Sequence, residues 1–334
     1  MKIFTIEEND ANQRLDKFLK KLFPRATRSL IYKLNRKSKI KVLSVGADGF
    51  RKQDNEYKLQ IGEQIKIFLS DKDFLELSQK EAPKTLDENK KFDKKNVVYE
   101  DGDLLVVNKD AGMNVHPGDY KTKEIDLITQ VQDYLGEKLQ SLTFKPSLIH
   151  RIDRDTSGLV LIAKKKNILQ KLSSDFRSHK NITKTYYALV LGKLSRQEGT
   201  IKKSLKRIEN AQNENKVQVS GSGKEAISHY KVLATHELKT KEDTLYISEL
   251  EVQIETGRMH QIRVHLASLG NPIIGDNNYG DKKLNIFFKN NYDISRQMLH
   301  AWKIDFFHPT RNKKIHLQAK LKDDMEKFLK RVGT

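Results

Sequence analysis

The 334-residue sequence contains no cysteine. This absence excludes disulfides, thiolate zinc sites, iron–sulfur clusters and a cysteine nucleophile. Long apolar runs are also missing: mean hydropathy is −0.68, and no stretch approaches the ~20 apolar residues of a membrane-spanning helix. The segment 1–10 turns acidic within seven residues and has no signal-peptide core. We therefore expect a soluble, cytoplasmic protein.

Two kinds of ligand site have no support in the sequence. Gly221 and Gly223 are not followed by a helix with a Walker lysine, so no nucleotide-binding loop is expected. His260 and His265 are five residues apart, which places them about 140° apart on a helix and does not suit joint metal ligation. We expect neither a metal ion nor a cofactor.

Positive charge is abundant. The chain has 63 Lys and Arg residues against 44 Asp and Glu residues, a formal net charge of +19. Such a balance indicates a polyanionic partner. A well-solvated, lysine-rich surface explains the same number, so charge alone does not decide between the two interpretations.

Residues 1–70 have the pattern of one small module. Apolar residues at helical spacing predict a helix over 13–23, and Thr27 or Ser29 can cap a second one. Short strands are predicted at 40–45, 57–60 and 64–69.

The two predicted helices of the module carry basic residues and almost no acidic ones. Nine Lys and Arg residues lie between Lys20 and Lys41 without a single acid. Solvated faces normally mix signs, so this window favours a phosphate-binding surface. The layout resembles the S-four-type (alpha-L) RNA-binding module, although Leu43–Gly49 replaces its usual Asn-Gly turn. The residues expected to bind RNA are Arg25, Arg28, Lys33, Arg36, Lys37 and Lys39.

Beyond the module, the composition predicts a linker over 71–95 and a second domain over 96–334. The linker is charged and has few apolar anchors. The later segments predict more strands than helices and no regular βαβ repeat, so we expect an α+β domain around a largely antiparallel sheet. Its strands are predicted at 97–99, 104–108, 159–163, 185–191 and 245–254, with helices at 124–135 and 259–269.

Two polar clusters are candidates for chemistry. His150–Gly158 precedes the apolar run 159–163 and sets Asp153 between two arginines, which favours the ionised carboxylate. An ordinary turn uses the same residue types. In the second cluster, 256–265, Arg263 lies on the edge of an apolar helix face. It needs a carboxylate partner, for which Asp153 or Asp155 is the candidate, unless it reaches water.

Together these clusters resemble the RluA-type pseudouridine synthases, whose His-Arg-Leu-Asp precedes a Thr-Ser-Gly turn. The other matching positions are 108–116 with Asp110 for the usual proline, 184–192, 256–266 with Met259 for the usual threonine, and Asp276, Tyr279 and Gly280. With the N-terminal module, the chain is most similar to the RluC branch, which modifies large-subunit ribosomal RNA.

The resemblance implies isomerisation of uridine to pseudouridine in RNA without a cofactor. The family's catalytic residues fall on Asp153, Tyr186 and Arg263. Arg151 matches an arginine thought to fill the space left by the extracted base, and His150 beside it is expected to contact RNA. Neighbouring side chains of a strand alternate, so only one of Tyr186 and Tyr187 can face the site. Whether Asp153 attacks the sugar or assists its deprotonation stays open.

Three alternatives remain at this point. A non-catalytic RNA-binding factor of ribosome assembly explains the charge and the module, but not the co-occurrence of Asp153, Tyr186 and Arg263. A metal-dependent nuclease would use Asp153 and Asp155. A pseudouridine synthase acting on tRNA would carry the same motifs. We expect a monomer with large-subunit ribosomal RNA as its partner and no membrane association.

Overall fold

The computed structural model describes residues 1–79, 91–117, 125–136, 141–179, 181–209, 215–240 and 244–333. The chain divides into two compact units. The first contains residues 1–92, 130–146 and 164–167, and the second contains residues 93–129, 147–163 and 168–334. No helix in these described ranges is long and apolar enough to cross a bilayer.

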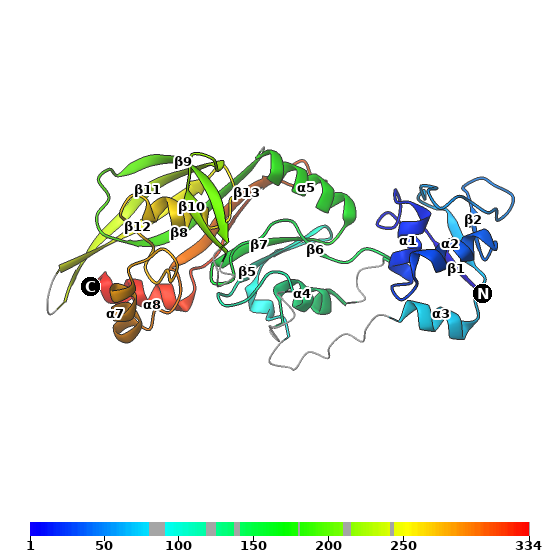
Figure 1. The fold of residues 1–334 in the computed structure, drawn as a ribbon, viewed down its shortest axis with the longest axis horizontal. Coiled ribbons are helices and arrows are strands. Elements are labelled where there is room, and N and C mark those ends of the chain that lie inside the picture. Colours follow the sequence, from blue (N-terminus) through cyan, green and yellow to red (C-terminus); the bar gives the residue numbers. More distant parts are fainter. Residues whose placement is uncertain are drawn as a thin grey trace. The chain divides into compact units, whose positions relative to one another are not determined.

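The first unit holds a small antiparallel sheet with strand order β1–β3–β2 (Figure 1). Its elements are β1 (Lys2–Thr5), α1 (Leu15–Leu22), α2 (Arg28–Arg36), β2 (Ile40–Leu43), β3 (Gln64–Ile67) and α3 (Asp71–Ser78). The apolar side of α1 is fully buried, through Leu15, Phe18 and Leu19. Of the two candidate caps for α2, Thr27 is the one used: its Oγ1 accepts a hydrogen bond from Leu30 N at 3.2 Å.

Three features of this unit differ from the sequence-based expectations. The edge strand β1 was not predicted. The strand predicted at 57–60 does not form; within it, Lys58 makes a single isolated bridge to Arg14. The first part of the predicted linker, 71–95, forms α3, whose Phe74 is buried in the module core. Residues 80–90 of that predicted linker lie outside the described residues.

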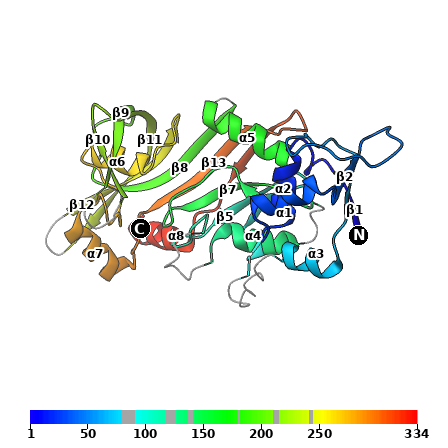
Figure 2. The same ribbon diagram turned by 45° about the vertical axis from the view of Figure 1, so that its right-hand side comes forward.

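A long, mainly antiparallel sheet organises the second unit (Figures 1 and 2). The order is β10–β9–β11–β12–β8–β13–β7–β5–β4, with β14 beside β13 and β6 beside β7. The strands are β4 (Val97–Glu100), β5 (Leu104–Lys109), β6 (Ser147–Leu148), β7 (Ser157–Ala163), β8 (Ile182–Leu191), β9 (Glu198–Glu209), β10 (Asn215–Val219), β11 (Lys224–Lys239), β12 (Thr244–Ile254), β13 (Leu299–Phe307) and β14 (Lys314–Gln318). This arrangement confirms the predicted α+β class.

Helices pack on this sheet at several places. α5 (Lys166–Ser178) buries Ile168 and Leu172 in a core shared with β5 and β7. α6 (Gln261–Ala267) contacts β9, β10 and β11, and begins two residues later than the predicted helix. Two further helices, α7 (Lys282–Tyr292) and α8 (Asp323–Val332), lie together in Figure 1. The ring centroids of Phe288 on α7 and Phe328 on α8 are 5.9 Å apart. The remaining bounds are α4 (Leu127–Leu135) and a 3₁₀ turn (Lys94–Asn96).

The strand after the Asp153 loop is buried along its whole length, as its apolar run predicted. β7 pairs with β5 on one side and in parallel with β13 on the other. At its start, Gly158 has a φ of +112°, and a Cβ there would lie 2.3 Å from the carbonyl oxygen of Ala301. No side chain fits in that space. The glycine therefore lets β7 lie directly against β13 at this position. This contact fixes the end of the loop that precedes β7.

Candidate active site

The loop that carries Asp153 is tied to the end of β5 by a buried lysine. Lys109 Nζ donates hydrogen bonds to the carbonyl oxygens of Asp110, Met113 and Arg154 at 2.7, 2.9 and 2.8 Å. Its side chain is buried, and this burial lowers the pKa of Lys109 to about 7. Because Arg154 directly follows Asp153, the lysine holds the backbone of the loop that carries Asp153.

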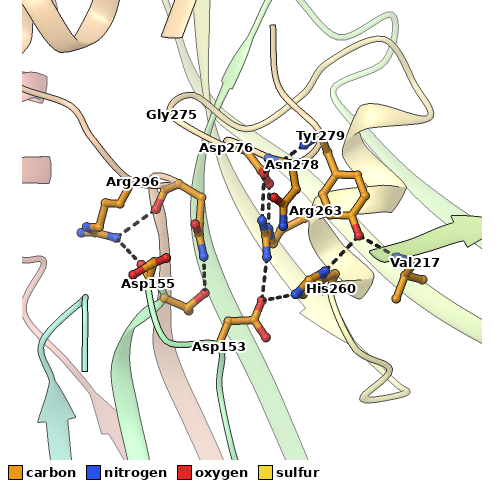
Figure 3. A network of polar contacts seen from close by, with 12 residues as sticks. Asp153, Asp155, Val217, His260, Arg263, Gly275, Asp276, Asn278, Tyr279 and Arg296 are labelled. Carbon is orange, nitrogen blue, oxygen red and sulfur yellow. Dashed lines mark hydrogen bonds and ion pairs between the residues drawn. The ribbon is translucent and has the colours of Figure 1, made fainter. Parts of the chain in front are cut away.

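Arg263, on α6, lies between two carboxylates (Figure 3). Its Nη1 is 3.2 Å from Asp153 Oδ2. Its Nε and Nη2 contact the two carboxylate oxygens of Asp276 at 2.7 and 2.8 Å. Burial alone would lower the pKa of the Arg263 guanidinium, but Asp276 and then Asp153 raise it above its usual value. A permanently charged group thus holds Asp153 in one direction.

The main partner of Arg263 is Asp276. The sequence did not predict this pairing. Its side chain is fully buried, whereas that of Asp153 is 30% exposed. Asp276 also accepts hydrogen bonds from the backbone N–H groups of Asn278 and Tyr279 at 2.9 and 3.1 Å. The available signal was its place in the matching segment 276–280. The structure therefore confirms a carboxylate partner for Arg263 and adds a second one.

The two neighbouring tyrosines of β8 point to opposite sides of the strand, as predicted. Tyr186 lines the pocket that contains Asp153. The hydroxyl of Tyr187 donates to Glu249 elsewhere, and its ring lies 5.5 Å from that of Trp302. Burial, and then the charge of Asp153, raise the pKa of Tyr186 far above its usual value. The pocket therefore holds Tyr186 as a protonated phenol.

His260 is a further group at the carboxylate that the sequence-based site does not include. Its Nε2 is 3.8 Å from Asp153 Oδ2, and its Nδ1 is 2.9 Å from the hydroxyl of Tyr279. That hydroxyl also accepts a hydrogen bond from Val217 N at 2.9 Å (Figure 3). Burial lowers the pKa of His260 against the opposing charge of Asp153.

Asp155, the other acid of the loop, is held apart from this group. Its carbonyl oxygen accepts a hydrogen bond from Arg296 Nη1 at 3.3 Å. Arg296 in turn forms two hydrogen bonds with Asp324, at 2.6 and 2.9 Å. Asp155 is not among the described residues that line the pocket around Asp153. Within the described ranges, no group of three or more His, Asp or Glu side chains could hold a metal ion.

The two predicted RNA-binding residues beside Asp153 differ in their surroundings. Arg151 is exposed and lines the pocket. His150 accepts a hydrogen bond from Leu161 N at 3.2 Å, and its ring stacks on Phe176 with centroids 4.7 Å apart. Burial lowers the pKa of His150 to about 3. The contacts of His150 in the structure are thus with the protein's own strand and helix.

The six cations expected to bind RNA in the first unit are all exposed; we call them the module cations. They are Arg25, Arg28, Lys33, Arg36, Lys37 and Lys39. Arg25 donates to Gln79 Oε1 at 2.7 Å, and Arg28 donates to the hydroxyl of Tyr32. Within the described part of the chain, the other four have no ion pair. They lie on α2 and the segment that follows it, and all four are exposed to solvent.

Comparisons with known proteins agree with this geometry. The family model for RNA pseudouridylate synthase matches residues 103–268. Ribosomal large subunit pseudouridine synthase C of Buchnera aphidicola (subspecies Baizongia pistaciae) is 36% identical over 95% of this chain and 92% of its own. The protein of the same name from Vibrio cholerae is 32% identical over 98% of this chain and 95% of its own.

The fold comparison points the same way. The solved structure of human RNA Pseudouridylate Synthase Domain Containing 4 matches with a TM-score of 0.55 at 24% identity, covering 72% of this chain and 93% of that one. At this identity the likeness supports the fold alone, whereas the two bacterial relatives match over almost their full lengths. The chain therefore belongs to the RNA pseudouridylate synthases and is an RNA-modifying isomerase.

Proposed function

We propose that this enzyme converts uridines of large-subunit ribosomal RNA to pseudouridine, with Asp153 as its catalytic residue. The observation that carries the proposal is the pocket in which Arg263 holds the partly exposed carboxylate of Asp153 beside Tyr186. The names of the bacterial relatives support the choice of RNA. The net charge of +19 fits a polyanionic substrate.

The reaction rearranges atoms without adding any. The bond between uracil N1 and ribose C1′ breaks, the base turns, and C5 bonds to C1′, while C5 loses a proton and N1 gains one. A carboxylate at the sugar can act as a nucleophile at C1′ or as a base toward the ribose. Asp153 suits both routes, because it is exposed enough to reach a substrate and is fixed by Arg263.

Two further pocket residues have roles toward the base. Tyr186 presents its ring beside Asp153, where it can stack on an extruded uracil. Arg151 is exposed at the same pocket and can occupy the gap in the RNA helix that extrusion leaves. Tyr186, Arg263 and Asp153 are thus the proposed catalytic group, and Arg151 is a proposed RNA contact.

We assign RNA affinity to the N-terminal module and chemistry to the remainder of the chain. In this division, residues 1–70 form an S-four-type RNA-binding module and residues 96–334 the catalytic domain. Residues 71–95 connect them, and the first part of this connection, α3, packs on the module core through Phe74. The exposure of the module cations supports the first assignment. Cytoplasmic location and a monomeric state complete the proposal, and size-exclusion chromatography with light scattering tests the latter.

Pseudouridine mapping tests the substrate assignment. Ribosomal and transfer RNA from cells with and without the gene would be compared at single-nucleotide resolution. We expect specific uridines of the large-subunit RNA to lose the modification, and the Asp153→Asn protein not to restore it. Loss confined to tRNA would replace the proposed substrate by the alternative one. An unchanged pattern in both RNAs would contradict the proposal.

A further inference from the structure

A chain of polar groups connects β10 to the proposed catalytic carboxylate (Figure 3). The backbone N–H of Val217 donates to the Tyr279 hydroxyl oxygen at 2.9 Å. That hydroxyl lies 2.9 Å from His260 Nδ1, and His260 Nε2 lies 3.8 Å from Asp153 Oδ2. All four residues belong to the second unit.

Counting protons gives this chain a direction. A phenol has one proton to donate, and burial raises the pKa of Tyr279, so the phenol keeps it. The Val217 N–H can only donate, so the Tyr279 oxygen accepts there. In the described part of the chain, the other hydrogen-bond partner of that oxygen is His260 Nδ1. The Tyr279 proton is thus available for donation to Nδ1, and in that arrangement Nδ1 is the unprotonated nitrogen.

The tautomer of His260 follows from that bond. Burial lowers the pKa of His260, which favours the neutral ring. A neutral imidazole has one N–H, and with Nδ1 accepting from Tyr279 the proton must be on Nε2. Nε2 is the nitrogen that faces Asp153. We propose that His260 is a positioning residue for Asp153: Tyr279 holds it as the neutral Nε2–H tautomer, which donates to the carboxylate when RNA is bound.

The same geometry distinguishes the two oxygens of Asp153. Arg263 Nη1 and His260 Nε2 both approach Oδ2, at 3.2 and 3.8 Å. Oδ1 has no hydrogen-bond partner in the described ranges. The separation of 3.8 Å exceeds a hydrogen bond, but such contacts in substrate-free enzymes often tighten in the complex. With Oδ2 held by two donors, Oδ1 is the oxygen that meets the ribose.

This inference rests on Asp153 being the catalytic residue, and its test uses a readout independent of activity. The full-length protein would be labelled with ¹⁵N-histidine, and long-range ¹H–¹⁵N spectra would show which ring nitrogen of His260 carries the proton. His260→Gln identifies the resonance by its loss. We expect the Nε2–H form in the wild type and a mixture of both tautomers in Tyr279→Phe. An Nδ1–H form in the wild type would overturn the proposal.

Kinetics with three folded variants complete the test. Tyr279→Phe should lower the single-turnover rate roughly threefold to tenfold, the effect of one ordinary hydrogen bond, with RNA affinity almost unchanged. His260→Gln should retain more activity than His260→Asn, because the longer amide reaches the Nε2 position and the shorter one does not. The left-handed backbone at His260, φ 54°, suits asparagine, so a slow Asn variant would not reflect misfolding.

The controls distinguish this proposal from the function on which it rests. Asp153→Asn should abolish turnover, and full activity in that variant would contradict the proposed function itself. If Asp153→Asn is inactive while His260→Asn and Tyr279→Phe match the wild-type rate, only the positioning role is refuted. Melting temperatures of each variant confirm that a slow enzyme is also a folded one.

Discussion

Replacing Arg263 by methionine should remove both stability and activity. Methionine preserves much of the apolar stem but has no charge and no N–H donors. Arg263 makes three contacts, of 2.7 and 2.8 Å to Asp276 and 3.2 Å to Asp153. Without it, a fully buried carboxylate loses its cation, and the partly exposed carboxylate loses the group that orients it.

The structure sets the size of the expected loss. Breaking a buried ion pair typically costs ~3–5 kcal/mol, because the remaining charge is stranded. Here the lower end applies: Asp276 keeps two backbone N–H donors, from Asn278 and Tyr279, and Asp153 can turn to water. A loss of about 3 kcal/mol corresponds to a melting temperature lowered by about 6–12 °C in a unit of roughly this size.

The assay combines thermal unfolding with tritium release from RNA labelled at uridine C5. Arg151→Met is the matched control for stability, because that arginine is exposed and the same charge is removed. Arg263→Lys keeps a charge but cannot span both carboxylates, so it should recover part of the stability and little of the rate. Unchanged melting and turnover in Arg263→Met would refute the argument that this arginine is the fixed cation of the site.

The remaining predictions address the chemistry, the RNA affinity and the acid sensitivity. Asp153→Asn should abolish tritium release while RNA binding persists, whereas Asp155→Asn should be much milder because it lies outside the pocket. Replacing the six module cations by glutamine should reduce the slope of log K for RNA binding against log salt concentration by about 4 to 5 in magnitude. An unchanged slope would mean that these cations form an ordinary solvated face. Burial lowers the pKa of His150 and His300 to about 3 from 6.5. Below pH 6.5 these two histidines take up protons in the unfolded chain but stay neutral in the folded one. The free energy of unfolding should therefore fall between pH 6.5 and about 3, by ~1.4 kcal/mol per pH unit for each histidine, and should show no such loss above pH 6.5. Melting curves at stepwise lower pH check this decline, which should weaken in His300→Asn.

Residues close in sequence supplied most of what could be predicted about the site. The loop around Asp153 and the strand after it are adjacent, so one cluster of polar residues before an apolar run located them. The alternation of Tyr186 and Tyr187 is a property of any strand. The pairing of Asp153 with Arg263 spans 110 residues, yet a guanidinium on an apolar helix face needs a carboxylate, and the polar cluster before β7 offered Asp153 and Asp155.

What could not be predicted depends on turns and long-range packing. Asp276 reaches Arg263 through a turn after α6, and no periodic pattern reports where a turn places its side chains. Helix α3 was assigned to a linker because one buried anchor, Phe74, is too weak a pattern. Six strands of the large sheet were not predicted either: β6, β9, β10, β11, β13 and β14. β9 is rich in charged residues, which hide its strand pattern. The strand β13 pairs with β7 and β8, which both lie far from it in the chain.

The buried cation explains how Asp153 can be both accessible and rigid. A carboxylate that meets RNA must be exposed, and an exposed side chain is normally free to rotate. Arg263 resolves this conflict because Asp276 occupies its Nε and Nη2, which fixes the plane of the guanidinium and leaves Nη1 aimed at Asp153. The buried pair is a costly element for stability alone, since apolar residues could fill the space as well. In the proposed function its role is orientation: the cost of burying Asp276 and Arg263 fixes the carboxylate of Asp153 in place before a substrate arrives.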